Sequence, residues 1–537
     1  MTATVFTLST LSCHTGLRKL WMGFPSGRIA GLHLCIITKT DILFKNGAIP
    51  VFFRTFASVF MLFNSIEFLV FLPVVFIIYW LLHKHLRWQN AFVVAASYLF
   101  YGWWDWRFLL LIAFTTLCSY LSGRRIAATD GNTRKLFLWG NILINLLILG
   151  VFKYYDFFAQ SFADAFLGGH ADHLLLHLVL PVGISFYTFQ ALSYSIDVYR
   201  GTIRPTRDLL AFTAYVSFFP QLVAGPIERA TSLLPQFEQA RRFDYRTAVD
   251  GMRQMLWGFF KKMVVADSCA VYVDNIFEHP DWFNGASLLL AAVLFTIQIY
   301  GDFSGYSDIA IGCAKLFGIK LRRNFNVPYF SRDIAEFWRR WHISLTTWFR
   351  DYIYIPMGGS RVSKGRIVLN TLVIFLVSGL WHGANWTYVA WGAYHALLFL
   401  PLILLGKNRK YRDIVAAGRR LPSWRELGQM LLTFFLAVMG WILFRADGIA
   451  EAWQYCVHMF STLFNGAPTL TSSKDAWIIS VAVFVMTVVE WVNRDCPHEF
   501  FRQPKHRWMR WASYTALLFM IGAFMVTNEM PFIYFQF

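Results

Sequence analysis

The sequence predicts an all-α polytopic membrane protein, and three observations support this prediction. Apolar residues make up 57% of the 537 residues and charged residues only 15%, whereas an ordinary soluble domain has about 25% charged residues. Apolar runs recur along the chain, many of them near the roughly 20 residues that a helix needs to cross a bilayer. Aromatic residues reach 18%, and Trp and Tyr gather near the ends of the runs, as they do at membrane–water interfaces.

The apolar character begins abruptly at Met61. Residues 1–60 mix Ser, Thr, Gly and basic residues without a clean apolar span, and they lack the features of a signal peptide. We therefore expect residues 1–60 to be an N-terminal extension, either disordered or the product of a misassigned start codon. Residues 61–537 are expected to form a single membrane domain.

Successive apolar runs predict the membrane helices in chain order. In the first part of the domain they cover residues 64–83, 88–104, 106–122, 136–158, 175–198, 208–224, 248–270 and 286–302. In the last part they cover residues 366–381, 384–405, 427–446, 476–492 and 511–527. The basic, proline-containing stretch 407–425 between two of these runs predicts a soluble loop.

The region 303–360 interrupts this pattern, because no stretch within it reaches the length of a simple span. The sequence GDFSG at 301–305 predicts a loop, and an Arg- and Trp-rich amphipathic helix follows within 336–356. Short helices that lie at the interface or re-enter the membrane explain the region best, since irregular backbone at membrane depth is tolerated where it lines a cavity. We expect eleven to fourteen helices in total, transmembrane and re-entrant together.

The formal net charge of +18 comes from basic residues that lie mostly in the short links between apolar runs. This placement indicates cytoplasmic loops and contact with anionic membrane lipids. No basic patch stands apart from the membrane segments, so a nucleic-acid partner is not expected. The seven cysteines form no CxxC pair, and the His173–His177 spacing lacks a supporting Glu–His motif. Neither a metal site nor a disulfide framework is therefore predicted.

Two histidines lie inside strongly apolar sequence and are the candidate catalytic residues. His342 stands in WRRWHIS and His382 in LWHGANW. Imidazole exchanges protons near neutral pH, and ionisable groups at membrane depth usually mark function. A purely structural role, as a buried histidine that only makes hydrogen bonds, remains open for each. The chain has neither a nucleophile elbow nor a Walker-type phosphate loop, which favours direct transfer between two bound substrates.

Residues beside the two histidines are the candidate substrate contacts. Helical periodicity directs Trp341 towards the membrane or the core, and leaves Arg340 and Arg350 available to water, lipid phosphate or an anionic ligand. Asn385 follows His382 closely enough to orient a carbonyl group. The full set of candidate substrate-binding residues is Arg339, Arg340, Trp341, Trp381 and Asn385.

Several long motifs carry a resemblance to a known family. They are LPVGISFYTFQALSYSIDVYRG (180–201), FFPQLVAGPIER (218–229), QIYGDFSGYSDIAIG (298–312), NFNVPYFSRDIAEFWRRWHISLTTWFRDYIYIPMGGSR (324–361) and LWHGANWTYVAWGAYHA (380–396). Through them, residues 61–537 resemble the membrane-bound O-acyltransferases, specifically the bacterial branch that contains the alginate O-acetylases.

The resemblance implies a helical fold around a funnel or tunnel, with His382 as the catalytic histidine and His342 as the second histidine of this branch. It implies acetyl-CoA from the cytoplasm as the acyl donor, no bound cofactor, and a location in the bacterial inner membrane. The acetyl group would reach a polysaccharide such as alginate through a periplasmic acetyltransferase partner. Peptidoglycan, teichoic acid and other secreted glycans remain alternative acceptors. A transporter or channel with a histidine proton relay is the alternative of another class.

Overall fold

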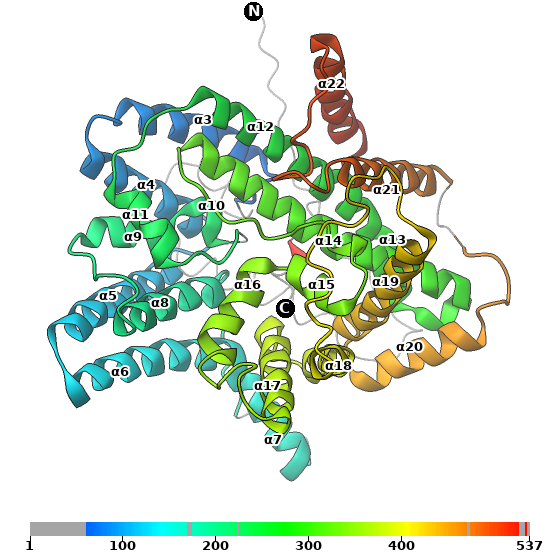
Figure 1. Cartoon of the computed structure of the whole chain (residues 1–537), viewed down its shortest axis with the longest axis horizontal. Coiled ribbons are helices and arrows are strands. Elements are labelled where there is room, and N and C mark those ends of the chain that lie inside the picture. The colour runs from blue at the N-terminus through cyan, green and yellow to red at the C-terminus, as the bar shows by residue number, and fades with distance from the viewer. Residues whose placement is uncertain (1–60, 169–173, 224, 470–472, 526–531, 534–537) are drawn as a thin grey trace, which may run out of the picture. The chain divides into compact units, whose positions relative to one another are not determined.

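The computed structural model describes residues 61–537 with the exception of 169–173, 224, 470–472, 526–531 and 534–537. Within these described residues every regular element is a helix, so the predicted all-α class is confirmed (Figure 1). The expectation for residues 1–60 lies outside the described part of the chain.

Five helical segments are long and apolar enough to cross a membrane, and they make this a multi-pass membrane protein. The longest, Gly131–Phe166, consists of α6 (Gly131–Leu149), the π-helical turn η1 (Gly150–Tyr154) and α7 (Tyr155–Phe166). The others are α14 (Gly285–Leu316), α17 (Lys364–His382), α18 (Trp386–Leu404) and α19 (Trp424–Arg445). Shorter apolar helices are α3 (Ile66–Leu81) and the Ala476–Val492 part of α21 (Ser473–Val492).

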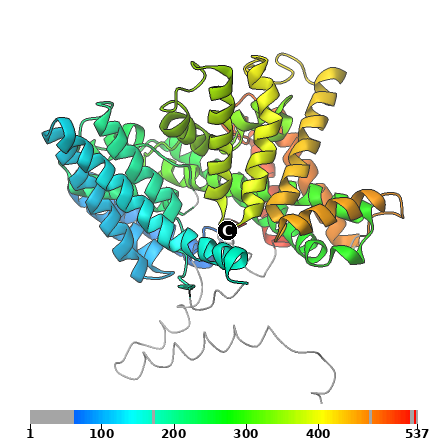
Figure 2. The same cartoon turned by 90° about the horizontal axis from the view of Figure 1, so that it is seen from below.

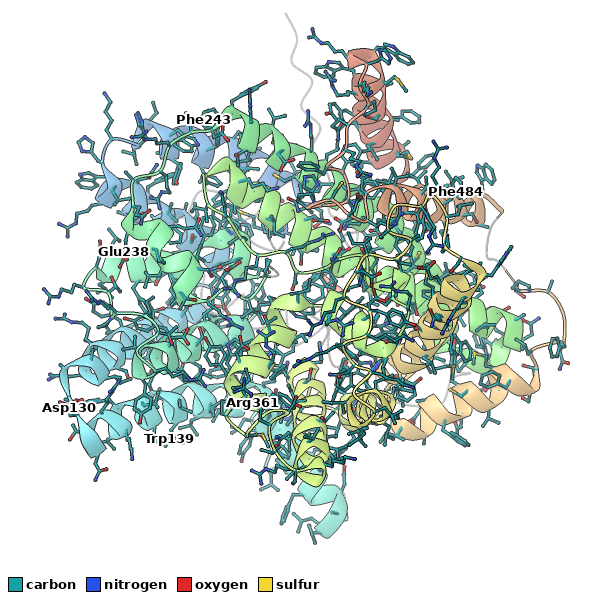
Figure 3. The ribbon with its side chains drawn as sticks, in the orientation of Figure 1. Asp130, Trp139, Glu238, Phe243, Arg361 and Phe484 are labelled. Atoms are coloured by element: carbon teal, nitrogen blue, oxygen red, sulfur yellow. The ribbon has the colours of Figure 1, made fainter. Side chains whose placement is uncertain are left out.

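Large apolar side chains on the outer faces of the helices agree with this membrane setting. On α5 (Arg107–Ala128), Leu110, Phe114, Leu117 and Leu121 recur every three or four residues and are all exposed. Trp139 on α6 and Phe484 on α21 also project outward (Figure 3). A soluble protein rarely exposes apolar stripes of this size, whereas lipid tails cover them without cost.

The N-terminal helices pack as a layered group. Helices α5, α6 and α8 (Ile184–Tyr199) contact one another, and α4 (Leu86–Gly102) contacts α9 (Leu209–Ser217) (Figure 1). The predicted run 175–198 is helical only from Ile184, because Pro181 and the left-handed Gly183, at φ 74°, precede the helix. The remaining short elements here are α10 (Phe219–Leu222) and α11 (Ala230–Glu238).

Helix α14 forms the centre of the fold, and its length shows that one sequence prediction was wrong. The GDFSG stretch, expected to be a loop, lies inside this 32-residue helix. Gly305 in this stretch has a packing role, because a Cβ atom on it would lie 2.8 Å from the carbonyl oxygen of Gly258 in α12 (Tyr245–Phe259). Glycine here permits close helix packing rather than a turn. The π-helical turn η2 (Phe260–Ala266) and α13 (Asp267–Glu278) follow α12 and also contact α14.

The predicted break between the membrane spans is confirmed. The single amphipathic helix expected within 336–356 is instead a series of shorter elements. These are η4 (Pro328–Phe330), α15 (Ile334–Arg340), α16 (Ile343–Phe349) and the π-helical turn η5 (Arg350–Tyr354). After them, α17 and α18 run side by side (Figure 2). Residues 407–423 form no helix, as predicted for the loop. The remaining elements are η3 (Pro280–Trp282), α20 (Ile449–Ser461) and α22 (Arg507–Phe524).

Candidate active site

His342 lies at the break between α15 and α16, in a left-handed backbone conformation with φ 42°. Such a conformation is uncommon for a residue other than glycine and recurs at functional sites. The side chain is buried, and its Nδ1 lies 3.0 Å from Oδ1 of Asn324. An amide oxygen only accepts hydrogen bonds, so Nδ1 carries the proton of the neutral ring and the lone pair is on Nε2.

Asn324 is itself held from several sides. Its Nδ2 donates to the hydroxyl of Ser307 on α14 at 3.1 Å, and the hydroxyl of Ser344 donates to its Oδ1 at 2.8 Å. Its backbone carbonyl accepts the N–H of Ile343 at 2.8 Å. The central helix therefore fixes the orientation of His342 through one amide side chain.

His382 is the last residue of α17 and is also buried. Its ring lies among aromatic rings, with centroid distances of 5.1 Å to Trp391 and 5.3 Å to Phe444. The ring of Trp381 is closer still, with its centroid 4.9 Å from that of His382.

Trp381 contacts both histidines. Its ring centroid is 5.8 Å from that of His342 and 4.9 Å from that of His382. The same indole also packs against Phe186 and Phe189 of α8. The fold thus brings two histidines that are forty residues apart in sequence into contact with a single buried indole.

A cavity of about 660 Å³ lies next to this centre, between α15, α16, η5, α17, α18 and the 407–423 loop. Ile343, directly after His342, and Ser378, one helical turn before His382, both line it. Four arginines contribute to its wall: Arg339, Arg350, Arg409 and Arg412. Its lining therefore combines apolar side chains near the histidines with a group of cations.

A second cavity, of about 70 Å³, lies against Trp381. His382, Trp381 and Lys153 line it together with residues 180–186 and Val223. The lining of the two cavities has no residue in common. His382 and Trp381 therefore line only the smaller cavity, and His342 lines neither.

Only two of the five predicted substrate-binding residues line one of the two cavities. Arg339 lines the large cavity and Trp381 the small one. Arg340 is buried and pairs with Glu336 at 2.7 Å, so the expectation that it is available to water, lipid or ligand is wrong. The ion pair forms because residues four apart on a helix face each other.

Trp341 and Asn385 line neither of these two cavities. Trp341 is fully buried against other aromatic rings, which confirms its predicted direction. The side chain of Asn385 accepts the N–H of Thr387 at 3.0 Å and so caps α18. A substrate contact by either residue remains a prediction.

Sequence reasoning missed Asn324, Lys153, Arg409 and Arg412. Lys153 had a usable signal, since it is a charged residue within an apolar run, where charge usually has a function. Asn324 and the two arginines had none, because they reach the site from segments that meet only in the folded chain.

Buried histidines inside a multi-pass helical fold, next to a cavity with several arginines, are typical of a functional site within a membrane protein. Residues 203–439 match the model of the membrane-bound O-acyltransferase family. The chain belongs to this family and is an O-acyltransferase. The resemblance inferred from the motifs is thereby confirmed, and family membership decides against the transporter alternative.

Curated relatives support the same branch. The chain is 42% identical to the "Probable alginate O-acetylase AlgI" of Pseudomonas aeruginosa, over 75% of each chain. It is 33% identical to a peptidoglycan O-acetyltransferase of Helicobacter pylori, over 78% of this chain and 82% of the relative. A teichoic acid D-alanyltransferase of Bacillus subtilis is 27% identical over 57% of this chain and 76% of the relative.

Proposed function

We propose that this protein transfers the acetyl group of acetyl-CoA for the O-acetylation of an exopolysaccharide such as alginate, in a bacterial inner membrane. The observation that carries the proposal is that His342 and His382 both contact Trp381, beside a cavity with several arginines. The similarity to alginate O-acetylases, at 42% identity, supports the acceptor class.

The large cavity is the proposed donor site. Its volume of about 660 Å³ falls within the 300–1,000 Å³ usual for small-molecule sites. Guanidinium groups bind phosphate well, and acetyl-CoA carries several phosphates. Arg409 and Arg412 take part in none of the described ion pairs, so their charges are available to a ligand. Arg339 also has no ion pair among the described residues, but its guanidinium already donates to the backbone carbonyls of Asn408 and Tyr411. Basic loops favour the cytoplasmic face, where acetyl-CoA is made.

The proposed chemistry is a direct transfer. The oxygen of an acceptor hydroxyl attacks the thioester carbonyl carbon, and His382 takes the hydroxyl proton as general base. The new C–O bond forms as the C–S bond breaks, and the proton passes to the sulfur of CoA. His342, with its lone pair on Nε2, is the second histidine of the centre. The apolar walls exclude water and so limit hydrolysis of the thioester.

The acceptor at the far side is proposed to be a periplasmic acetyltransferase partner, which passes the acetyl group on to the polysaccharide. Peptidoglycan is the second candidate acceptor, because the relative from Helicobacter pylori matches 78% of this chain at 33% identity. The same transfer at the membrane serves both acceptors. They differ in the glycan that receives the group.

The test is mass spectrometry of surface glycans from a deletion strain that carries either wild-type protein or His382→Ala. We expect the wild-type gene to restore O-acetyl groups and His382→Ala to leave them absent at equal protein abundance. His506→Ala, at an exposed histidine before α22, is the matched control and is expected to behave as wild type. Wild-type O-acetylation with His382→Ala would contradict the mechanism, and acetylated peptidoglycan in place of exopolysaccharide would select the second acceptor.

A further inference from the structure

Lys153 lies within the apolar Gly131–Phe166 segment, in its π-helical turn. Its Nζ donates to the carbonyl oxygen of Trp381 at 2.7 Å and to that of His382 at 3.1 Å. A π-helical turn inserts an extra residue into a helix and is frequent at functional sites. The lysine therefore reaches two residues of the site, Trp381 and His382, from a segment more than two hundred residues earlier.

The neighbouring residue completes this contact. The hydroxyl of Tyr154 donates to the carbonyl oxygen of Leu380 at 2.9 Å. Three successive carbonyls at the end of α17 thus accept hydrogen bonds from η1. The last carbonyls of a helix lack partners within the helix and carry partial negative charge, so a cation is favourable there.

The ammonium group has no carboxylate partner among the described ion pairs. It lies 5.9 Å from the ring centroid of Trp381 and lines the small cavity together with His382. A lysine has three N–H donors, and the two carbonyls use two of them. An unpaired charge at membrane depth is expensive, and it is retained where it serves a function.

We propose that Lys153 is a positioning residue for acyl transfer, which holds the backbone of His382 at the small cavity and fixes one positive charge beside it. The inference rests on the proposed role of His382. When the acceptor oxygen attacks the thioester, negative charge develops on the carbonyl oxygen. A fixed cation in a site without bulk water stabilises that charge more than it stabilises the bound substrate.

Three substitutions separate the charge from the hydrogen bonds. Lys153→Arg keeps both, Lys153→Gln keeps donors but removes the charge, and Lys153→Met removes both. Tyr154→Phe removes the neighbouring hydrogen bond without a change of charge and is the matched control for the structural contact. Each purified protein is assayed for acetyl transfer from radiolabelled acetyl-CoA, with kcat expressed per folded molecule from size-exclusion chromatography in detergent.

We expect Lys153→Gln and Lys153→Met to lower kcat by at least about tenfold, which is below the 10²–10³-fold loss typical of a single transition-state donor. Lys153→Arg is expected to retain more activity than Lys153→Gln, and KM for acetyl-CoA should stay unchanged in all three. Tyr154→Phe is expected to lower kcat by less than Lys153→Gln.

A Lys153→Gln protein with wild-type kcat, or with the same kcat as Lys153→Arg, would overturn the role of the charge. Equal losses in Lys153→Gln and Tyr154→Phe would show that only the hydrogen bonds to α17 matter and would overturn it as well. A wild-type protein that transfers no acetyl group would instead refute the proposed function, so the two failures are distinct.

Discussion

The Nδ1 atom of His342 lies 3.0 Å from the Oδ1 atom of Asn324, and this contact sets the tautomer of the histidine. The same amide connects to Ser307 on α14, so the orientation of the imidazole depends on the central helix. A histidine that takes part in proton transfer needs its unprotonated nitrogen at a defined place, and a second group usually provides this. Asn324 is the group that does this for His342.

Asn324→Ala is expected to lower kcat for acetyl transfer by about tenfold or more, a loss smaller than the 10²–10⁴-fold that an acid–base group itself contributes. The imidazole loses the acceptor that holds the proton on Nδ1, so the ring can take the other tautomer. KM for acetyl-CoA should change little, because Asn324 does not line the donor cavity. Steady-state kinetics on the purified protein measure both constants.

Asn465→Ala, at an exposed asparagine outside the site, controls for the chemical change. If Asn324→Ala and Asn465→Ala have equal kcat values, His342 needs no orientation by Asn324. A rise in KM without a fall in kcat would place Asn324 in donor binding instead.

The two arginines of the 407–423 loop that line the large cavity are expected to bind the phosphates of acetyl-CoA. Arg409→Ala and Arg412→Ala should each raise KM for acetyl-CoA by about three- to tenfold, which corresponds to about 0.7–1.4 kcal/mol. The effect is modest because both side chains are exposed to screening by water and salt. The kcat value should stay close to that of the wild type, since neither residue lies beside the histidines.

Arg366→Ala is the matched control, because Arg366 is an exposed arginine on α17 that does not line the cavity. It should leave KM unchanged. Equal KM values for Arg366→Ala and both loop variants would move the donor site away from this cavity.

The sequence predicted those parts of the site whose signal is local. A titratable side chain in an apolar run is unusual by itself, and this identified His342 and His382. Arg340 was misjudged because a helical period shows which face a residue occupies but not that Glu336 lies within reach on that face. Asn324 carried no signal, since its value comes from contact with a histidine beyond an intervening helix.

The same difference between local signals and long-range contacts applies to the fold. Apolar length predicted most of the helices, because the membrane imposes it. The glycines at 301 and 305 predicted a loop, although they lie within α14. Glycine favours both turns and close helix packing, and only the position of α12 against α14 decides between them.

Gly379→Ala is expected to destabilise the protein, because the new Cβ would lie 2.2 Å from the carbonyl oxygen of Tyr388 in α18. Backbone atoms cannot move aside as a flexible side chain does, so α17 and α18 must separate. Overpacking of this kind costs about 1–3 kcal/mol. Gly379 precedes His382 by three residues, so acetyl transfer should fall as well. Thermal unfolding in detergent, followed by light scattering, measures the loss.

Gly365→Ala tests the same substitution in the same helix. A Cβ at Gly365 would meet no atom within 4 Å, and alanine is the better helix former. Its unfolding temperature should equal or exceed that of the wild type. A Gly379→Ala protein as stable as Gly365→Ala would show that the two helices do not pack as closely as the structure has them.

Lys261→Met is expected to reduce the yield of folded protein severely. The buried ammonium of Lys261 pairs with Asp308 on α14 and lies 4.0 Å from a carboxylate oxygen of Glu499. Its removal leaves the buried carboxylate of Asp308 without a counter-ion, which costs about 3–5 kcal/mol, whereas Glu499 keeps its pair with Arg323. Arg502→Met breaks the exposed pair with Asp495 and should cost no more than about 1 kcal/mol. Fluorescence-detected size-exclusion chromatography compares the two, and equal folded yields would contradict a structural role for the buried pair.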